Sequence, residues 1–292
     1  MRIARFDGDR LGMVRDNVLY DVSAVLKDVA HQAWPLAFGD PLLAALPNLR
    51  RALEEMSHPV SPRAVADVRF NSPVSWATKI MAAPANYRKH VELDSLDPGV
   101  DQGAHRASVI ALDRPVDTLG LFLKASSSLV GEAEGIVLDR PDRRCDHEVE
   151  LAAVIGTTMK GVSKLEAMEG VAGYAIGLDI TLRGVEDRSF RKSADTFSVL
   201  GPWLVTADEI DDPQDLALWL DVNGERRQDS STSAMTVGIA ELISLASQMY
   251  TLYPGDILMT GTPEGVGSLA PGDEIRAGCE RIGEIRVQVR GR

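Results

Sequence analysis

The sequence predicts a β-rich α+β fold. Short runs of apolar or alternating residues, which are typical of strands, dominate the chain. They are not separated by regular helical segments, and this disfavours a Rossmann or TIM arrangement. The 292 residues are 45% hydrophobic and 25% charged, a composition typical of a globular protein with ample material for a core.

The first part of the chain predicts a small sheet followed by a helix. Three short alternating runs occupy residues 1–25, and residues 40–57 have a helical periodicity that Pro47 interrupts. A proline-rich stretch that follows resembles a linker. We therefore expect a small N-terminal domain over residues 1–75 and a larger domain over residues 76–292.

The larger part of the chain continues mainly as strands. Residues 79–90 predict a strand followed by a loop, and helices are expected at residues 163–171 and 237–250. Residues 92–118 show little periodicity, and a loop of this length is uncommon unless it is functional or mobile. We expect this segment to act as a lid that closes over the site when a ligand binds.

Charge and composition exclude several classes of partner. Thirty-one basic residues against 43 acidic ones give a net charge of −12, without a run of Lys or Arg. We therefore expect no binding to nucleic acid, which requires neutralisation of phosphates, and none to an anionic membrane. The sequence shows no signal peptide or membrane span, and its two cysteines are too few for a disulfide framework. These features predict a cytoplasmic protein.

The most informative segment is CDHEVELAAVIG, which begins at Cys145. Glu148 and Glu150 stand two residues apart in a run patterned as a buried strand, so both should project from one face. Two like charges so close repel each other, and a divalent cation between them would remove the conflict. With Asp179, at the end of a second apolar strand, three carboxylates could bind Mg²⁺, Mn²⁺ or Ca²⁺ rather than Zn²⁺. On spacing alone, the alternative is a solvated face of an edge strand.

Other polar residues are open to two interpretations from the residues alone. His90, in a segment rich in acids, is either a general base or a surface histidine. Arg183 and Lys192 either anchor an anion or form a solvated basic face. The glycine-rich segment TGTPEGVG, residues 260–267, either lets backbone N–H groups hold an oxyanion or is a turn after a strand.

Six motifs, taken in order, resemble those of the fumarylacetoacetate hydrolase family: NYRKH, DHEVELAAVIG, GYAIGLDIT, RKSADTF, LGPWLVTADEI and GDILMTGTPEGVG. The resemblance covers about residues 78–290, and the residues before it resemble the small accessory domain of many bacterial members. It implies a mixed β-roll with peripheral helices, a homodimer, and a site for Mg²⁺ or Mn²⁺. It also implies a small anionic oxo-acid as the substrate.

The resemblance assigns roles by position in the motifs. The residues that correspond to the family's metal ligands are Glu148, Glu150 and Asp179. The residues that correspond to its catalytic and substrate-binding groups are Lys192, Arg183, Gly261 and Thr262 in the Gly-Thr loop, and His90, which activates water together with an acid.

Two positions depart from the family pattern. The acid that assists the histidine commonly lies three residues after it, where this chain has Leu93 between Glu92 and Asp94. We predict Glu92 as the acid that assists His90. Some members have glutamine seven residues after the aspartate ligand, where this chain has Glu186. The charge of Glu186 would need a cationic partner near an anionic substrate.

These assignments predict a metal-dependent hydrolase that cleaves a C–C bond in an acylpyruvate-type diketo acid. Water activated by His90 would attack the distal carbonyl, while Lys192 and the Thr262 loop stabilise the oxyanion. The main alternative is a decarboxylase or isomerase that acts on an unsaturated 2-oxo or 2-hydroxy dicarboxylic acid of aromatic catabolism at the same metal site. A non-catalytic protein that binds small acids is the third hypothesis.

Overall fold

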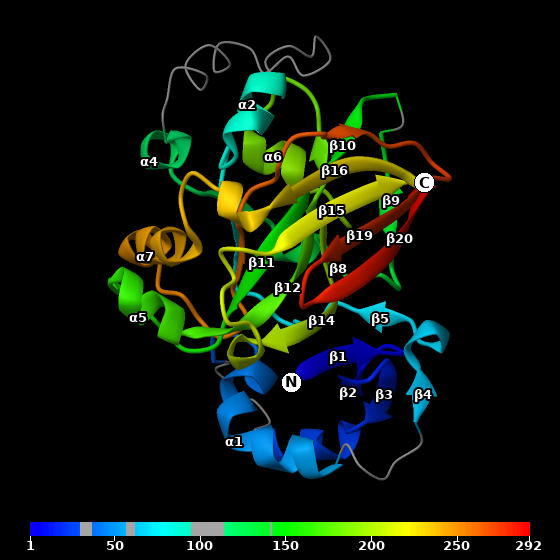
Figure 1. Cartoon of the computed structure of the whole chain (residues 1–292), viewed down its shortest axis with the longest axis vertical. Helices are drawn as coiled ribbons and strands as arrows, with labels where there is room; N and C mark the ends of the chain where they lie inside the picture. Colours follow the sequence, from blue (N-terminus) through cyan, green and yellow to red (C-terminus); the bar gives the residue numbers. More distant parts are fainter. Residues whose placement is uncertain (30–36, 57–61, 95–113, 141) are drawn as a thin grey trace.

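The computed structural model describes residues 1–29, 37–56, 62–94, 114–140 and 142–292. Most of its strands form one large sheet, and two smaller sheets and several helices surround it (Figure 1). The prediction of a β-rich fold with peripheral helices is confirmed.

The large sheet contains twelve strands among the described residues. Ten of them follow one path, in the order β4 (Arg63–Ala64), β3 (Val18–Asp21), β2 (Arg10–Arg15), β1 (Arg2–Phe6), β14 (Ser198–Thr206), β12 (Val171–Asp179), β11 (Val149–Ile155), β17 (Ile257–Met259), β6 (Ile80–Ala82) and β7 (Phe122–Lys124). The other two strands are β5 (Phe70–Asn71), which pairs with β1, and β8 (Leu129–Val130), which pairs with β14.

The two smaller sheets are also ordered by their pairing. One contains β13 (Thr181–Leu182), β10 (Cys145–His147) and β18 (Gly267–Ser268). The other contains β16 (Glu225–Ser231), β15 (Ala217–Val222), β19 (Glu274–Cys279), β20 (Gly283–Gly291) and β9 (Ile136–Leu138).

The helices lie around these sheets. They are α1 (Pro41–Met56), α2 (Arg88–Asp94), α4 (Pro115–Leu119), α5 (Lys164–Glu169), α6 (Arg188–Lys192) and α7 (Ile239–Met249). The 3₁₀ turns are η1 (Ser23–Asp28), η2 (Val65–Asp67), η3 (Ser126–Ser128), η4 (Ala207–Glu209) and η5 (Thr232–Ala234). Figure 1 shows α2, α6 and β10 at one end of the molecule, with α1 and the N-terminal strands at the opposite end. None of the helices in the described ranges is both long and apolar enough to cross a lipid bilayer.

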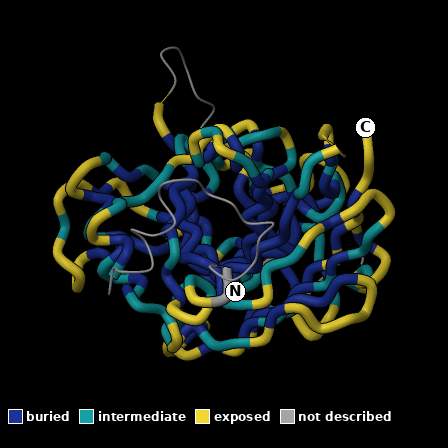
Figure 2. Tube along the Cα trace, turned by 90° about the horizontal axis from the view of Figure 1, so that it is seen from above, coloured by how far each residue is buried: buried dark blue, intermediate teal, exposed yellow. Residues whose placement is uncertain are grey.

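The central strands separate two hydrophobic cores. Along β11, Leu151 and Ala153 belong to one core, and Ala152 and Val154 belong to the other. Side chains alternate along a strand, so Glu150 shares the face of Ala152 and Val154. Figure 2 shows the buried trace running through the middle of the molecule and the exposed segments around its rim. The acidic face of β11 therefore continues directly into a core.

The prediction that Pro47 interrupts the first helix was wrong, because α1 runs through it. Pro47 is exposed, and the helix buries a stripe of leucines on its other side: Leu43, Leu46, Leu49 and Leu53. Burial of a leucine side chain contributes about 1.5–3 kcal/mol, whereas a proline inside a helix costs about 3 kcal/mol. The buried stripe therefore outweighs the cost of the proline.

The N-terminal strands extend the sheet of the larger part of the chain. β1 pairs with β14 through Arg2↔Val205 and Ile3↔Leu204. The stretch expected to be a linker contains β4, η2 and β5, and β5 in turn pairs with β1. The division into residues 1–75 and 76–292 stays a prediction.

Two further expectations concern the segment after β6. The residues from Arg88 onward form the helix α2 instead of the expected loop. The Asn86 side chain fixes the turn before this helix by donating to the carbonyl oxygens of Val237 at 2.9 Å and Thr260 at 2.8 Å. A helix of only seven residues has too little periodicity to be recognised in the sequence. Most of the predicted lid, residues 95–113, lies outside the described residues.

Candidate active site

Three carboxylates meet where β11 and β12 run side by side. Glu148 occupies the break between β10 and β11, Glu150 lies in β11, and Asp179 ends β12. The antiparallel register sets Asp179 opposite Glu148, and the Asp179 backbone N–H donates to the Glu148 carbonyl oxygen at 2.9 Å. One carboxylate oxygen from each of the three residues lies within 4.8 Å of the others. We call these three buried residues the carboxylate cluster.

Two buried lysines compensate part of the charge of this cluster. The Lys192 ammonium, at the end of α6, donates to Glu148 Oε2 at 2.8 Å and to Asp179 Oδ2 at 2.6 Å. Lys124, at the end of β7, donates to Asp179 Oδ1 and to the Phe197 carbonyl oxygen. Burial opposes the charged form of Lys192, but the charges of Asp179 and Glu148 raise its pKa above the ordinary value. Lys192 is therefore a cation at neutral pH.

Glu148 is stabilised as an anion. Burial alone would raise its pKa, but the charges of Lys192 and Arg183 hold the pKa of Glu148 below its ordinary value. The Thr181 hydroxyl donates to Glu148 Oε1 at 2.7 Å, and Arg183 Nη2 lies 3.9 Å from the same oxygen. Hydrogen bonds to a carboxylate favour its charged form.

Glu150 has a different environment. Burial, followed by the charges of Asp179 and Glu148, raises the pKa of Glu150 well above its ordinary value. The Gly261 backbone N–H donates to Glu150 Oε2 at 2.6 Å, but no lysine or arginine of the described ranges forms an ion pair with Glu150. The cluster therefore holds one carboxylate whose charge is not compensated.

These donors fit a hard divalent cation. Three convergent carboxylate oxygens match the ligands that Mg²⁺, Mn²⁺ and Ca²⁺ prefer, and the cluster contains no Cys or His. A cation bound there would also compensate Glu150 and lower the repulsion among the three acids. The chemistry of the site thus supports a metal held by the three carboxylates.

The Gly-Thr loop, Gly261 and Thr262 after β17, contacts Glu150. Gly261 has a φ of +99°, and a Cβ atom there would lie 2.7 Å from Asn86 Cβ, so glycine is required at this position. The Thr262 hydroxyl donates to the Val149 carbonyl oxygen at 2.8 Å and accepts a hydrogen bond from Gln228 Nε2 at 2.8 Å. In this arrangement Gly261 presents an N–H group to the cluster, while Thr262 anchors the loop to β11.

The helix α2 places His90, but not Glu92, toward the carboxylate cluster. His90 is half-buried, and a positive charge on it helps to lower the pKa of Glu148, so the imidazole lies within electrostatic range of the cluster. Glu92 is exposed and lies 3.6 Å from Arg88 Nε, in an i,i+4 pair. Residues two apart on a helix do not face each other, so α2 does not turn Glu92 toward His90. The structure brings His90 to the site and leaves Glu92 on another face of the helix.

Glu186 has the cationic partner that its position requires. Arg143 donates to both carboxylate oxygens of Glu186 at 2.8 Å, and this arginine holds the pKa of Glu186 down to about 2. Arg183 Nε donates to the buried carboxylate of Asp146 at 2.7 Å. The structure thus places Arg183 beside the cluster and Glu186 in a separate pair with Arg143.

Four residues of the site were missed in the sequence: Lys124, Thr181, Gln228 and Arg188. Lys124 had a recognisable signal, because a lysine ends the otherwise apolar run LGLFL. Gln228 had none, because it lies in the polar strand β16, where no apolar alternation marks a strand. It connects this strand to the site by accepting from the Val149 N–H at 3.0 Å.

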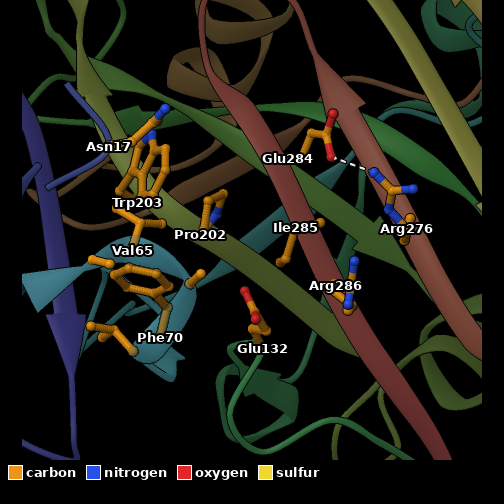
Figure 3. Close-up of a pocket in the computed structure, with 13 residues that line it drawn as sticks. Asn17, Val65, Phe70, Glu132, Pro202, Trp203, Arg276, Glu284, Ile285 and Arg286 are labelled. Carbon is orange, nitrogen blue, oxygen red and sulfur yellow. Dashed lines mark hydrogen bonds and ion pairs between the residues drawn. The ribbon is translucent and has the colours of Figure 1, made fainter. Parts of the chain in front are cut away.

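A separate cavity of about 540 Å³ lies away from the carboxylate cluster. It opens between the N-terminal segment around Val65 and Phe70 and strands β14, β19 and β20 (Figure 3). None of the predicted site residues lines it. The chemistry therefore concentrates at the cluster and not in this cavity.

Comparison with known proteins agrees with this site. The model of the fumarylacetoacetate (FAA) hydrolase C-terminal family matches residues 79–290. The chain is 46% identical over 290 residues to the maleylpyruvate hydrolase of Aquipseudomonas alcaligenes, and the alignment covers 99% of each chain.

Two solved structures are similar over the whole chain. One is maleylpyruvate hydrolase from Sphingobium sp. SYK-6 in complex with manganese(II) ion and pyruvate, with a TM-score of 0.81 and 38% identity, covering 100% of this chain and 99% of that chain. The other is 5-carboxymethyl-2-hydroxymuconate delta-isomerase from Mycobacterium smegmatis, with a TM-score of 0.72 and 30% identity, covering 100% of this chain and 99% of that chain.

Proposed function

This chain belongs to the fumarylacetoacetate hydrolase family, and we propose that it is a metal-dependent hydrolase that cleaves a C–C bond in a small acylpyruvate. The carboxylate cluster carries the proposal, because its three convergent buried acids, one of which has no ion-pair partner among the described residues, match the ligands of a divalent cation. The similar maleylpyruvate hydrolase that holds manganese and pyruvate supports it, since pyruvate is what hydrolysis of an acylpyruvate releases.

The metal would be held by Glu148, Glu150 and Asp179. We propose Mn²⁺ or Mg²⁺ as the native ion, with Ca²⁺ as a further cation that such oxygen ligands accept. When bound, the ion supplies Lewis-acid polarisation of the 2-oxo group and compensates negative charge that develops on its oxygen.

The residues of this chain would perform the remaining steps. His90 accepts a proton from water as the water oxygen bonds to the 4-oxo carbon, and Lys192 donates a hydrogen bond to the resulting oxyanion. The bond between carbons 3 and 4 then breaks, its electron pair leaves with the pyruvate enolate, and carbon 3 takes up a proton. Arg183 and the Gly261–Thr262 loop would orient the substrate beside the cluster.

A second function uses the same site without attack by water. A decarboxylase or isomerase of an unsaturated 2-oxo dicarboxylic acid needs the enolate but no water-activating pair. The similarity to an isomerase at 30% identity favours it. The product of the reaction distinguishes the two functions.

The decisive experiment is a product assay with purified protein. Maleylpyruvate and acetylpyruvate are incubated with the protein and Mn²⁺ or Mg²⁺, pyruvate is followed with lactate dehydrogenase, and the second acid is identified by chromatography. We expect equal amounts of pyruvate and the second acid, and loss of turnover on chelation of the metal. Release of CO₂, or an isomerised acid without cleavage, would contradict the hydrolase and support the second function.

A matched pair of variants connects the activity to the cluster. Glu148→Gln removes a charge from the site and should lower kcat/KM by about 10³-fold, because several kcal/mol of charge stabilisation depend on the metal. Glu55→Gln removes the same charge from the exposed face of α1 and should leave kcat/KM unchanged. Equal activity of the two variants would rule out the cluster as the site.

We also propose that the protein is a cytoplasmic homodimer in which residues 1–75 form an accessory domain. Family membership supports the dimer, and the net charge of −12 and the two cysteines support the compartment. Light scattering on the purified protein tests the dimer. A mass that matches one chain of 31.6 kDa would contradict it.

A further inference from the structure

α6 carries a second cation on the same face as Lys192. Arg188 and Lys192 stand four residues apart on this helix, so their side chains are neighbours with Cβ atoms about 5–6 Å apart. Both cationic groups approach the Phe122 ring, at 5.4 Å for the guanidinium and 5.3 Å for the ammonium. Lys192 is buried at the cluster, whereas Arg188 is half-buried one turn away.

The guanidinium of Arg188 differs from those of the arginines around it. Arg191 donates to the carbonyl oxygens of Glu186 at 2.8 Å and Leu182 at 3.1 Å, and Arg183 is bound to Asp146. For Arg188, no hydrogen bond or ion pair is present within the ranges that the structure describes. Its guanidinium instead lies 5.4 Å from the centroid of the Phe122 ring, in a cation–π contact.

The nearest acids along the chain are already engaged. The Asp187 carboxylate caps α6 by accepting from the Ser189 N–H at 2.8 Å, and Glu186 is bound by Arg143. Burial lowers the pKa of Arg188, and the charges of Glu148 and Asp179 oppose this effect, which places the guanidinium in the field of the cluster. A half-buried arginine without an anion is costly, and its planar donors suit a carboxylate.

We propose that Arg188 binds the distal carboxylate of the substrate and selects acylpyruvates whose acyl group is itself a short diacid. This inference rests on the proposed function. A substrate anchored by its 2-oxo acid at the cluster extends past Lys192, and a carboxylate at the far end of a four-carbon acyl group reaches the guanidinium one turn away. The Phe122 ring is a neighbour that both cationic groups share.

The experiment compares a substrate that carries a distal carboxylate with one that does not. Maleylpyruvate carries a distal carboxylate and acetylpyruvate does not. In Arg188→Met, kcat/KM for maleylpyruvate should fall about 10- to 100-fold, the range for a hydrogen-bonded charge, while that for acetylpyruvate changes less than about threefold. Arg188→Lys keeps the charge without the planar pair of donors. Its kcat/KM for maleylpyruvate should lie between the values of wild type and Arg188→Met. Arg51→Met removes an exposed charge from α1 and serves as the control.

A binding measurement separates this inference from the proposed function. Calorimetry on the metal-free protein compares maleate with isocrotonate, which has the same cis four-carbon skeleton and one carboxylate. Wild type should bind maleate more tightly, and Arg188→Met should lose the preference. If wild type hydrolyses neither substrate but maleate binding depends on Arg188, the hydrolase proposal fails and the anion site stands. If Arg188→Met affects both substrates equally, or wild type shows no preference for maleate, the role of Arg188 is overturned.

Discussion

Carboxylates in two parts of the protein, the carboxylate cluster and the half-buried Glu132, have contrasting environments. In the carboxylate cluster, three acids converge within 4.8 Å, and lysines form ion pairs with two of them. In the cavity beside β20, Glu132 lies near the apolar side chains of Phe70 and Ile285, whereas the other acid that lines the cavity, Glu284, is paired with Arg276 (Figure 3). There burial raises the pKa of Glu132 to about 7, although the Arg286 backbone N–H and the charges of Arg286 and Arg69 oppose the shift.

The difference in compensation between the carboxylate cluster and Glu132 indicates the role of each. A buried acid with weak compensation becomes neutral, because proton uptake costs less than burial of the charge. Two of the acids in the cluster instead have cationic partners, because Lys124 and Lys192 are buried beside them, and burial of these lysines is itself costly. Such an arrangement stabilises a bound cation and a developing negative charge more than it stabilises the fold.

The largest effect is expected when the compensation of the cluster is broken. Lys124→Met leaves the Asp179 carboxylate with Lys192 alone and removes the bond to the Phe197 carbonyl oxygen. Loss of one partner of a buried pair costs about 3–5 kcal/mol, so urea unfolding should show a loss of this size. Arg51→Met should change the free energy of unfolding by less than about 0.5 kcal/mol. Equal stability of the two variants would mean that the lysines do not compensate the acids.

The two neighbouring glutamates should respond in opposite directions. Glu150→Gln keeps the shape of the side chain and removes an acid that must take up a proton when it is buried without metal, so the metal-free protein should become more stable by about 1–3 kcal/mol at neutral pH. Glu148→Gln removes an acid that is bonded to Lys192 and Thr181, so the metal-free protein should become less stable. Thermal unfolding with and without Mn²⁺ measures both effects.

The response to metal completes this comparison. Mn²⁺ should raise the unfolding temperature of wild type and of neither variant, because each lacks one carboxylate ligand. Destabilisation of the metal-free protein by Glu150→Gln would show that Glu150 is not the uncompensated member of the cluster.

The sequence predicted the acidic residues of the site better than the basic residues that pair with them. Glu148 and Glu150 stand out because charge is unusual in a buried strand, and the order of the family motifs adds Asp179 and Lys192. The structure brings these four residues together. Lys124 lies 55 residues from Asp179, and the two meet only because β7 pairs with β6 at the edge of the large sheet. Local patterns contain no information about such a pairing.

The outline of the fold was also predictable from local patterns. The elements that were missed depend on contacts between distant parts of the chain or are too short or too polar to show a pattern. Long apolar strands such as β11, β12 and β14 have a local signal, whereas β16 is polar along its length. The continuity of α1 through Pro47 depends on burial against other elements, which local propensity does not include. The position of Glu92 follows from α2 being a helix, and its seven residues were too few to be recognised.

The second buried acid predicts a pH-dependent effect. The pKa of Glu132 is about 7 in the folded protein, whereas the ordinary pKa of a glutamate is 4.5, so the folded state binds more protons between these values. The contribution of Glu132 to stability is therefore fully present below about pH 4.5 and is lost as the pH rises through 7. Glu132→Gln should be as stable as wild type near pH 4 and more stable by about 1–2 kcal/mol at pH 8, with allowance for partial exposure. Urea unfolding at the two pH values measures this difference, and a constant difference would contradict it.

The smallest effect on stability is expected at the pair that joins Arg143 to Glu186. Both side chains are partly exposed, so Arg143→Met should change the unfolding temperature little. The pKa of Glu186 is held at about 2, below its ordinary value of 4.5, so the small contribution of the pair is present above pH 4.5 and is lost as the pH falls toward 2.

Function should be more sensitive to this pair than stability. Without Arg143, the Glu186 charge lies uncompensated near Arg191 and Arg183, and it should raise KM for an anionic substrate by about 3- to 10-fold. Arg143→Met combined with Glu186→Gln removes both charges and should restore KM, because the repulsion comes from the carboxylate alone. A double variant as impaired as Arg143→Met would show that Arg143 contacts the substrate itself. The Arg143–Glu186 pair would then resemble the carboxylate cluster, whose charges bind ligands, and would differ from Glu132, whose charge has no such role.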